Sequence, residues 1–482
     1  GKTQELAPGT SETVTITVDK YLLASYDTTA HDGAGGYILS DGDYYLAIGE
    51  DSHDALNNVL AAEGYTAANG MTAEGTAAKT YSFKQSFDDD KYRTGENGAI
   101  VSNQFADADL NYWVDGAGTY LSRSDWQGTW PVSYDSLTAN DAIINGLQFN
   151  YTAEAPDETA ITGSTATNYT LANLIGKDYD DPMWVDLLNQ LTLTDLAELV
   201  GHSGYGTRAI ASIGLPATVA ADGPQGIKAT YAGNNSTVAY TSEPVMAATF
   251  NTEILYNVGL SMGEDALRSD NRVVGWYGPA MNIHRTPYSG RNFEYYSEDG
   301  ILTGLIDARE TVGIQSKGVY VYNKHFAFND QETGRDGICV WTNEQAAREI
   351  YLQAFEYPIA DANAYCVMTS FNRLGATWAG GDYNLITNIL RGEFGMPGFV
   401  LTDFSNNNAF MDVIQGLLAG GDGWDCNDAS KWTAKLKTYS DDPQVVSAMR
   451  EATKHILYTV ANSNAMNGMG FNTIVEEVHG WW

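Results

Sequence analysis

The sequence is poor in basic residues, in cysteines and in long apolar runs, and each shortage excludes a class of function. Only 26 Lys and Arg stand against 61 Asp and Glu, which gives a formal net charge of −35. Nucleic-acid binding requires a basic face, so we expect no nucleic-acid partner. Cys339, Cys366 and Cys426 are widely spaced and form no CxxC pair, which indicates neither a zinc site nor a disulfide framework. No apolar run is long enough to cross a bilayer.

Two common cofactor motifs are also missing from the sequence. The seven His are scattered, and none belongs to an HExxH pattern of the kind that binds zinc. No glycine-rich loop has the spacing that holds a phosphate at the start of a helix. We therefore expect neither a metal nor another cofactor.

The chain is long and apolar enough to fold into two or three domains, with 482 residues of which 43% are hydrophobic. Residues 1–50 alternate apolar and polar side chains at 13–18, 36–39 and 44–48, which is typical of a β-sandwich. Three or four strands are too few for a sandwich, which has about seven. We expect the other strands to come from upstream residues or another chain, and the numbering to start inside a larger product.

From residue 181 the pattern changes to strands that alternate with helices. We predict strands at 217–221, 273–277, 319–322, 364–369 and 399–401, and helices at 184–199, 252–268, 300–317, 343–362, 383–393 and 410–419. Repeated units of this kind predict an α/β fold, and about 250 residues favour a (β/α)8 TIM-like barrel over a doubly wound sheet.

The rest of the chain is assigned around this barrel. Residues 181–430 form the predicted barrel, and 431–482 a helical extension that contains a helix at 443–460. Residues 51–180 are read as a connector that wraps the barrel, with a helix at 52–62, a strand at 79–83 and an aromatic anchor within 122–131. The terminal pair Trp481-Trp482 is interpreted as packing.

Polar residues follow each predicted strand of the barrel. They are Asp222 and Lys228, Arg291, Lys324 with His325 and Arg335, Ser370 with Asn372, and Asp403. Because the carboxyl ends of parallel strands meet at one mouth of a barrel, we expect these side chains to converge. Carboxylate, guanidinium, ammonium and imidazole groups together can bind several adjacent hydroxyls, which indicates a sugar.

Asp403 ends the short apolar strand 399–401 and is the candidate catalytic nucleophile. The alternative from this stretch alone is that Asp403 is the N-cap of the next helix, because Asp is a favoured capping residue. The convergence of five polar strand ends favours the catalytic interpretation.

Four separate blocks resemble glycoside hydrolase family 3, the β-glucosidase and β-xylosidase group. They are Ala221 to Gly226, Gly278 to Asp299, Lys324 to Arg335, and Leu401 to Phe404, and they occur in the family's order across about residues 185–430. The resemblance implies that Asp403 is the nucleophile of a retaining double displacement. It assigns substrate binding to Asp222, Lys228, Arg291, Lys324, His325, Arg335, Met368, Phe371 and Phe404.

Three positions depart from the family's pattern. Phe404 replaces a usual Trp, Phe371 replaces a frequent Tyr, and Lys228 stands where Arg is common. The larger departure is the carboxylic acid that protonates the leaving oxygen, about 5 Å from the nucleophile in retaining enzymes. In the β-glucosidase branch this Glu lies on an α/β sandwich domain, which this sequence does not contain.

Some family members place the sandwich and a fibronectin type III-like domain before the barrel, and residues 1–50 look like the end of that second domain. We therefore predict that the acid/base lies on a partner segment or chain upstream of Gly1. The predicted function is a retaining, exo-acting β-glycosidase acting on small oligosaccharides or glycosides. The alternative is a non-catalytic sugar-binding barrel that has lost the acid. An exported or cell-associated bacterial location is slightly favoured over a cytoplasmic one.

Overall fold

The computed structural model describes residues 3–69, 71–120, 138–153, 163, 166–228, 237–405 and 410–476. The chain divides into two compact units, and each is described by itself. The smaller unit is Thr13–Thr94 with Ile100–Asn103, and the larger is Gly1–Glu12, Gly95–Ala99 and Gln104–Trp482. The predicted aromatic anchor and the pair Trp481-Trp482 lie outside the described residues.

The smaller unit contains two antiparallel strand pairs and one regular helix. Strand β1 (Ser25–Asp27) pairs with β2 (Gly36–Ile38), and the short turn α1 (Ala30–Gly33) lies between them. Strand β3 (Gly42–Ala47) pairs with β4 (Thr80–Gln85). Helix α2 (Ser52–Ala62) starts where the Asp51 side chain accepts a hydrogen bond from the Asp54 N–H. The predicted helix 52–62 is confirmed, and the strand predicted at 79–83 corresponds to β4.

The strand predicted at residues 13–18 is wrong. This segment has no pairing with the described residues, and Val14 and Ile16 are 61% and 80% exposed. An alternating sequence becomes a strand only when a neighbouring strand satisfies its backbone groups and covers its apolar face.

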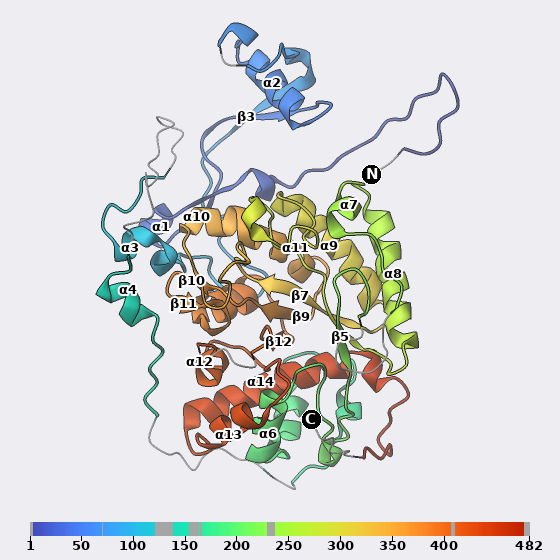
Figure 1. Cartoon of the computed structure of the whole chain (residues 1–482). Coiled ribbons are helices and arrows are strands. Elements are labelled where there is room, and N and C mark those ends of the chain that lie inside the picture. Colours follow the sequence, from blue (N-terminus) through green and yellow to red (C-terminus); the bar gives the residue numbers. More distant parts are fainter. Residues whose placement is uncertain are drawn as a thin grey trace. The chain divides into compact units, whose positions relative to one another are not determined.

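The larger unit is organised around a five-stranded parallel sheet of order β12-β9-β7-β6-β5 (Figure 1). Its strands are β5 (Ala220–Asp222), β6 (Gly275–Tyr277), β7 (Tyr320–Phe326), β9 (Cys366–Thr369) and β12 (Val400–Leu401). A parallel bridge between Leu401 and Gly423 extends the sheet beyond β12. The predicted parallel α/β fold is confirmed, while closure into eight strands stays a prediction.

Helices pack around this sheet in two groups. In Figure 1 the first group is α8, α9 and α11, and the second is α6, α12, α13 and α14. The helices of the larger unit are α3 (Leu110–Trp113), α4 (Asp141–Gly146), α5 (Met183–Asn189), α6 (Leu193–Gly201), α7 (Glu243–Ala247), α8 (Thr252–Arg268), α9 (Gly300–Gln315), α10 (Glu344–Ala346), the π-helix η8 (Ala347–Leu352), α11 (Gln353–Ala360), the π-helix η10 (Asn384–Glu393), α12 (Val413–Leu418), α13 (Ser430–Lys437) and α14 (Pro443–Ala461). No helix of the described ranges is both long enough and apolar enough to cross a membrane.

A second, smaller sheet lies in the same unit. Strand β10 (Arg373–Leu374) pairs in parallel with β8 (Cys339–Val340) and in antiparallel with β11 (Thr377–Trp378). This sheet positions Arg373 beside the turn to β11.

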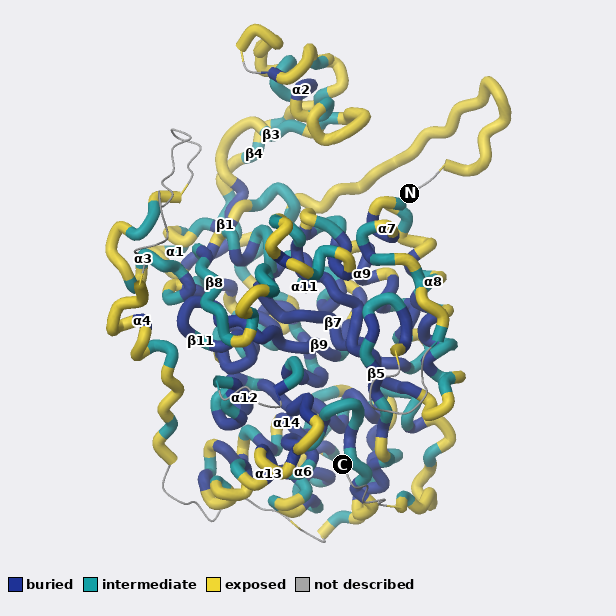
Figure 2. Tube along the Cα trace, in the orientation of Figure 1, coloured by how far each residue is buried: buried dark blue, intermediate teal, exposed yellow. Residues whose placement is uncertain are grey.

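Alternate residues of the parallel strands enter different apolar clusters, as the two-residue period of a strand requires. One cluster takes Ala220, Tyr277, Tyr320, Tyr322, Cys366, Met368 and Leu401. The residues between them belong to two other clusters, which contain Ala221, Trp276, Val321, Val367 and Val400. Both faces of the sheet are therefore buried, as Figure 2 shows for β7 and β9.

The single helix predicted at 184–199 is two helices, α5 and α6. The break occurs because Thr192 caps α6: its hydroxyl accepts from the Asp195 N–H, while the Asp195 carboxylate accepts from the Thr192 N–H. Helix α12 also starts later than the predicted residue 410, because Asp412 is its N-cap. The other predicted strands and helices of the barrel are present, with ends that differ from the predicted ones by at most four residues.

Candidate functional site

Strand periodicity places four of the predicted residues on one face of the parallel sheet. Asp222, Lys324, Met368 and Asp403 each lie two residues beyond a member of the first apolar cluster: Ala220, Tyr322, Cys366 and Leu401. The pairing of β7 with β9 shifts register between Lys324 and Phe326. Such an irregularity redirects side chains at strand ends, and here His325 joins Lys324 at the site.

Lys324 and Asp222 form the first contact of the site. The Lys324 ammonium donates to Asp222 Oδ1 at 2.8 Å, and the Gly223 N–H donates to the same oxygen at 2.8 Å. The Lys324 side chain is 4% exposed and that of Asp222 is 38% exposed. Although burial raises the pKa of Asp222, the nearby Lys324 and the Gly223 N–H bring this pKa below its ordinary value. Asp222 is therefore an ionised acceptor that a ligand hydroxyl can reach.

His325 is the centre of the second group of contacts. Its Nε2 lies 2.8 Å from an Arg291 nitrogen and 3.6 Å from Asp403 Oδ2. Its backbone is fixed by Asn282, which accepts from the His325 N–H at 2.7 Å and donates to the His325 carbonyl at 2.9 Å. The hydroxyl of Tyr295 lies 3.3 Å from Nδ1. The contacts with Arg291, Asp403, Asn282 and Tyr295 together orient the buried imidazole.

The charge and tautomer of His325 follow from these neighbours. Burial, together with the charges of Arg291, Lys324 and Arg335, lowers the pKa of His325 well below its ordinary value, so the ring is neutral. A guanidinium can only donate, so Nε2 accepts from Arg291 and the proton is on Nδ1, facing Tyr295. Oδ2 of Asp403 consequently receives no hydrogen bond from the imidazole.

Asp403 is a buried carboxyl among cations. Its Oδ1 accepts from the Phe404 N–H at 2.7 Å, and its side chain is 13% exposed. Burial raises the pKa of Asp403, and the charge of Arg291 offsets this only in part. Arg291 in turn pairs with the buried Glu294. Asp403 caps no described helix, because α12 is capped by Asp412, so the capping alternative is wrong for the described residues.

Arg335 and Phe371 lie together at the rim of the site. The Arg335 guanidinium is 4.7 Å from the centre of the Phe371 ring, and it pairs with Glu332 at 3.0 Å. Its charge acts on both His325 and Asp403. Met368 and Phe371 are buried in the first apolar cluster, and Phe404 packs against that cluster. These residues are predicted substrate contacts, and the structure gives them an apolar surface beside the charged group.

In the described ranges the side chain of Lys228 makes no hydrogen bond or ion pair with the other predicted residues. Its backbone N–H donates to the Asp222 carbonyl at 2.8 Å, but the side chain is exposed. Its role in binding stays a prediction.

Sequence reasoning missed Asp425, a second buried carboxyl of this site. Its N–H donates to the Thr402 hydroxyl at 3.0 Å, and its carbonyl accepts from the Ser405 N–H at 2.7 Å, so these bonds bracket Asp403. Its Oδ1 is buried with no hydrogen-bond partner among the described residues. Burial, followed by the charges of Asp403 and Asp222, raises the pKa of Asp425 well above its ordinary value. Asp425 is therefore neutral beside an ionisable Asp403.

Tyr295 and Asn282 were also missed as site residues, although both lie in the block 278–299. Their position in that block could have indicated them. Their contacts with His325 could not be predicted, because Tyr295 is 30 and Asn282 is 43 residues away from it in the sequence. No group of three His, Cys, Asp or Glu in the described part of the chain is placed to hold a metal ion. The arrangement places the carboxyl groups of Asp222 and Asp403 beside the ammonium group of Lys324 and the imidazole of His325, which are groups able to hydrogen-bond with hydroxyls.

Comparison with known families identifies two regions of the chain. Residues 191–418 match the model described as "Glycosyl hydrolase family 3 N terminal domain", and residues 1–52 match "Fibronectin type III-like domain". The second match agrees with the predicted fibronectin-like segment at 1–50. The order of the two regions agrees with the predicted order, in which the fibronectin-like segment precedes the barrel.

Several characterised proteins are similar to this chain. "Beta-glucosidase A" of Butyrivibrio fibrisolvens is 29% identical over 432 residues, which cover 87% of this chain and 48% of the relative. "Beta-glucosidase" of Ruminococcus albus is 31% identical over 427 residues, which cover 84% of this chain and 39% of the relative. The chain thus spans less than half the length of these two relatives.

Two solved structures have folds similar to that of this chain. The β-glucosidase 3B of Thermotoga neapolitana in complex with glucose is 31% identical, with a TM-score of 0.53 over 59% of this chain and 43% of that one. A β-glucosidase from Paenibacillus barengoltzii shares the fold over 95% of this chain and 48% of its own, with a TM-score of 0.64 and 23% identity.

Proposed function

Because this chain belongs to glycoside hydrolase family 3 through residues 191–418, we propose that it carries the nucleophile and sugar-binding part of a retaining β-glycosidase. In this proposal Asp403 is the catalytic nucleophile. Asp222, Arg291, Lys324 and His325 hold the sugar against it. The proposed chemistry uses carboxyl groups only and needs no cofactor.

The observation that carries the proposal is the set of contacts made by the adjacent residues Lys324 and His325. Lys324 contacts Asp222 at 2.8 Å, and His325 lies 3.6 Å from Asp403 and 2.8 Å from Arg291. Residues in or after β5, β6, β7 and β12 thus form two groups of polar contacts, which are brought together by the adjacent residues Lys324 and His325. A sugar with several adjacent hydroxyls can bind such a network of donors and acceptors.

The first step would form a bond between an Asp403 oxygen and the anomeric carbon, while the glycosidic bond breaks and its electron pair leaves with the departing oxygen. The tautomer of His325 leaves Asp403 Oδ2 without a hydrogen bond from the ring. Arg291 lowers the pKa of Asp403 against the effect of burial, which keeps part of the carboxyl ionised for attack. Water then attacks the same carbon and gives its proton to the carboxylate that protonated the leaving oxygen, while the bond to Asp403 breaks and its electron pair returns to the Asp403 carboxylate.

The departing oxygen needs a proton from a second carboxyl. We propose that this acid is supplied by a segment or chain outside this sequence, in line with the relatives' greater length. Asp425 is a poor candidate for the acid, because its backbone brackets Asp403 and its side chain is 2% exposed. The names of the relatives favour an exo-acting β-glucosidase that removes terminal β-linked sugars.

The proposal is tested by the Asp403→Asn variant in the complete protein, which pairs this chain with its acid-bearing segment. Hydrolysis of an aryl β-glucoside should fall at least about a thousandfold, because the variant loses its nucleophile. The control is Asp441→Asn, an exposed Asp outside the site, which should keep full activity. Unchanged hydrolysis in Asp403→Asn would remove Asp403 from this role, and glucose binding without turnover in the unaltered protein would favour a sugar-binding barrel.

A further inference from the structure

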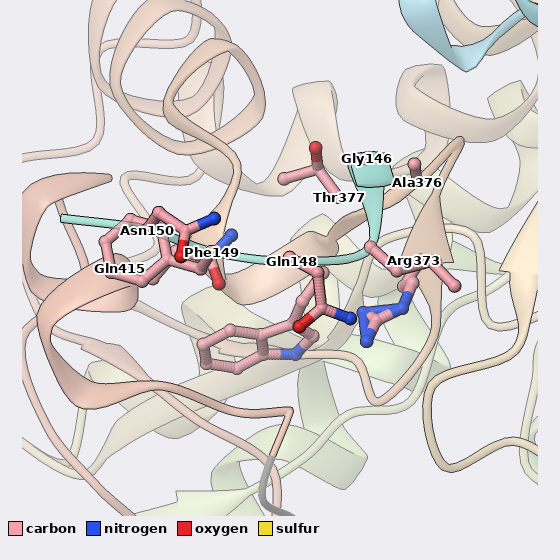
Figure 3. Close-up of a pocket in the computed structure, with 10 residues that line it drawn as sticks. Gly146, Gln148, Phe149, Asn150, Arg373, Ala376, Thr377 and Gln415 are labelled. Atoms are coloured by element: carbon pink, nitrogen blue, oxygen red, sulfur yellow. The ribbon is translucent and has the colours of Figure 1, made fainter. Parts of the chain in front are cut away.

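A cavity of about 310 Å³ lies apart from the contacts described above, between residues 146–150 and the small sheet β8-β10-β11. Its polar lining consists of Arg373, Gln148, Asn150, Thr377 and Gln415. In Figure 3 the side chains of Arg373 and Gln148 point into the same space, while Asn150 and Gln415 lie at its other end. A cavity of this size is at the lower limit for small-molecule sites and suits one sugar ring rather than an oligosaccharide.

Arg373 is a buried cation without an acidic partner. It is 9% exposed, and within the described ranges no carboxylate lies in ion-pair distance of its guanidinium. In the described ranges its guanidinium lies 5.1 Å from the centre of the Phe410 ring, and the Cys339 thiol is a titratable group that interacts with it electrostatically. Burial lowers the pKa of Arg373 from its ordinary value, as expected for a cation that lacks a compensating anion.

The absence of an acid beside Arg373 is informative in this chain. Acidic residues outnumber basic ones by 61 to 26, so a cation has many possible partners. The buried Arg348 pairs with Glu344 and Glu393, and the half-buried Arg391 pairs with Asp422. A buried charge is costly unless it is paired, so an anion that enters the cavity would gain from neutralising Arg373.

The other lining groups select among anions. Gln148, Asn150 and Gln415 each offer an amide that both donates and accepts, and Thr377 offers a hydroxyl. Such groups can both donate to and accept from hydroxyls, whereas a bare inorganic anion uses only their donors. A guanidinium binds a carboxylate through two parallel hydrogen bonds.

We propose that this cavity is a binding site for an acidic monosaccharide unit, a hexuronate whose carboxylate is held by Arg373 and whose hydroxyls are held by the surrounding amides. The site is distinct from the proposed catalytic network, which contains none of its lining residues. It would let the protein bind a sugar acid as part of a substrate or as a separate ligand.

The test is calorimetric titration of the full chain with sodium D-glucuronate, D-glucose and inorganic phosphate. We expect glucuronate to bind with a Kd of about 1 mM or tighter. The Arg373→Met variant should weaken this binding at least about tenfold, because it removes the cation but keeps the length of the side chain. The matched control Arg309→Met, on an exposed position of α9, should bind as the unaltered chain does.

A second variant keeps the test decisive if Arg373→Met folds poorly. Gln148 is exposed, so Gln148→Glu should fold normally, and its added carboxylate should weaken glucuronate binding by a similar factor. Absence of glucuronate binding at about 10 mM, or binding that neither variant changes, would overturn the proposal. Phosphate that binds as tightly as glucuronate would also overturn it, because the cavity would then recognise only a bare anion.

Discussion

His325 lies between Arg291 and Asp403, two residues of the proposed site. Its ring is buried and neutral, and the Arg291 guanidinium occupies the Nε2 lone pair that would otherwise face Asp403. The Tyr295 hydroxyl oxygen accepts a hydrogen bond from the Nδ1–H and another from the Asn329 amide at 2.8 Å. The network therefore keeps the carboxylate near a cation rather than near an acidic proton.

The charge of Arg291 should set the acidic limit of activity. Burial raises the pKa of Asp403 and Arg291 lowers it, so removing the cation should raise this pKa further. With a dinitrophenyl β-glucoside, whose leaving group needs no protonation, the rate should fall as pH drops through the pKa of Asp403. In Arg291→Gln the midpoint of this fall should move to higher pH by about one unit or more.

The control for this prediction is Arg291→Lys, which keeps the positive charge and should leave the midpoint closer to that of the unaltered protein. A purely structural role of Arg291 would lower the rate in both variants without moving the midpoint. The readout is therefore the position of the pH profile rather than its height.

At the scale of single elements, helices α8 and α9 are packed at an unusually short distance. A Cβ on Gly259 of α8 would lie 2.2 Å from the Glu310 carbonyl oxygen of α9, and one on Gly313 would lie 2.4 Å from the Tyr256 carbonyl oxygen. These glycines allow the two backbones to meet directly. The contact also keeps Glu310 beside Tyr296 in the interior.

Gly259→Ala should lower the free energy of unfolding by about 1–3 kcal/mol, measured by denaturant unfolding. Alanine favours a helix over glycine by roughly 1 kcal/mol, but the carbonyl oxygen is a backbone atom and can move only with its helix. The control Gly470→Ala meets no atom within 4 Å and should be neutral. A stabilised Gly259→Ala variant would mean that α8 and α9 separate easily.

Much of the element order could be predicted from the sequence, because buried parallel strands appear as short apolar runs between turn residues. The runs at 319–322 and 399–401 correspond to β7 and β12. Strand ends were less predictable, since β7 continues to Phe326 through pairing with β9. The strand predicted at 13–18 was also wrong because strands depend on pairing. Its apolar and polar residues alternate, but no described strand pairs with it.

The candidate site was predictable where its residues end strands and not where they depend on distant contacts. Asp222 ends β5, Lys324 lies two residues before the end of β7, and Asp403 lies two residues after β12, and strand periodicity places all three on one face. Asp425 was not found because its position results from hydrogen bonds to Thr402 and Ser405 rather than from a local pattern. Lys228 was assigned from its place in the sequence, but its side chain is exposed.

At the scale of the whole molecule, acidic residues buried without a cation should make stability depend on pH. Burial raises the pKa of Glu243 from 4.5 to about 9, with the charges of Glu310 and Glu294 adding to the effect. Burial also raises the pKa of Glu310 to about 7 and that of Asp382 to about 7. These groups hold protons in the folded chain that the unfolded chain releases at lower pH.

Stability should therefore be greatest below about pH 4.5 for these groups and should fall as pH rises through their folded pKa values. Between its unfolded and folded pKa values, each such group lowers the free energy of unfolding by about 1.4 kcal/mol for every pH unit. For Glu243 the interval runs from pH 4.5 to about 9. The net charge of −35 acts in the same direction, because self-repulsion grows as carboxyls ionise.

The Glu243→Gln variant separates these two effects. It keeps an oxygen that can accept the 2.7 Å bond from the Gln225 amide but removes the proton equilibrium. Its Tm should fall less steeply than that of the unaltered chain between pH 6 and about 9. Glu298→Gln, at an exposed position, also replaces one Glu by Gln but removes no buried proton, and it should leave the slope unchanged. Equal slopes in all three proteins would contradict a protonated Glu243.

The central claim, that Asp403 is the nucleophile, can be tested on this chain without any partner segment. A dinitrophenyl β-glucoside with fluorine in place of the hydroxyl next to the anomeric carbon releases its leaving group unprotonated, and its covalent product is hydrolysed slowly. After incubation, intact-mass measurement should show one added fluorosugar, mapped by peptide sequencing to Asp403 and absent from Asp403→Asn. No adduct, or an adduct on another residue such as Asp425, would contradict the account.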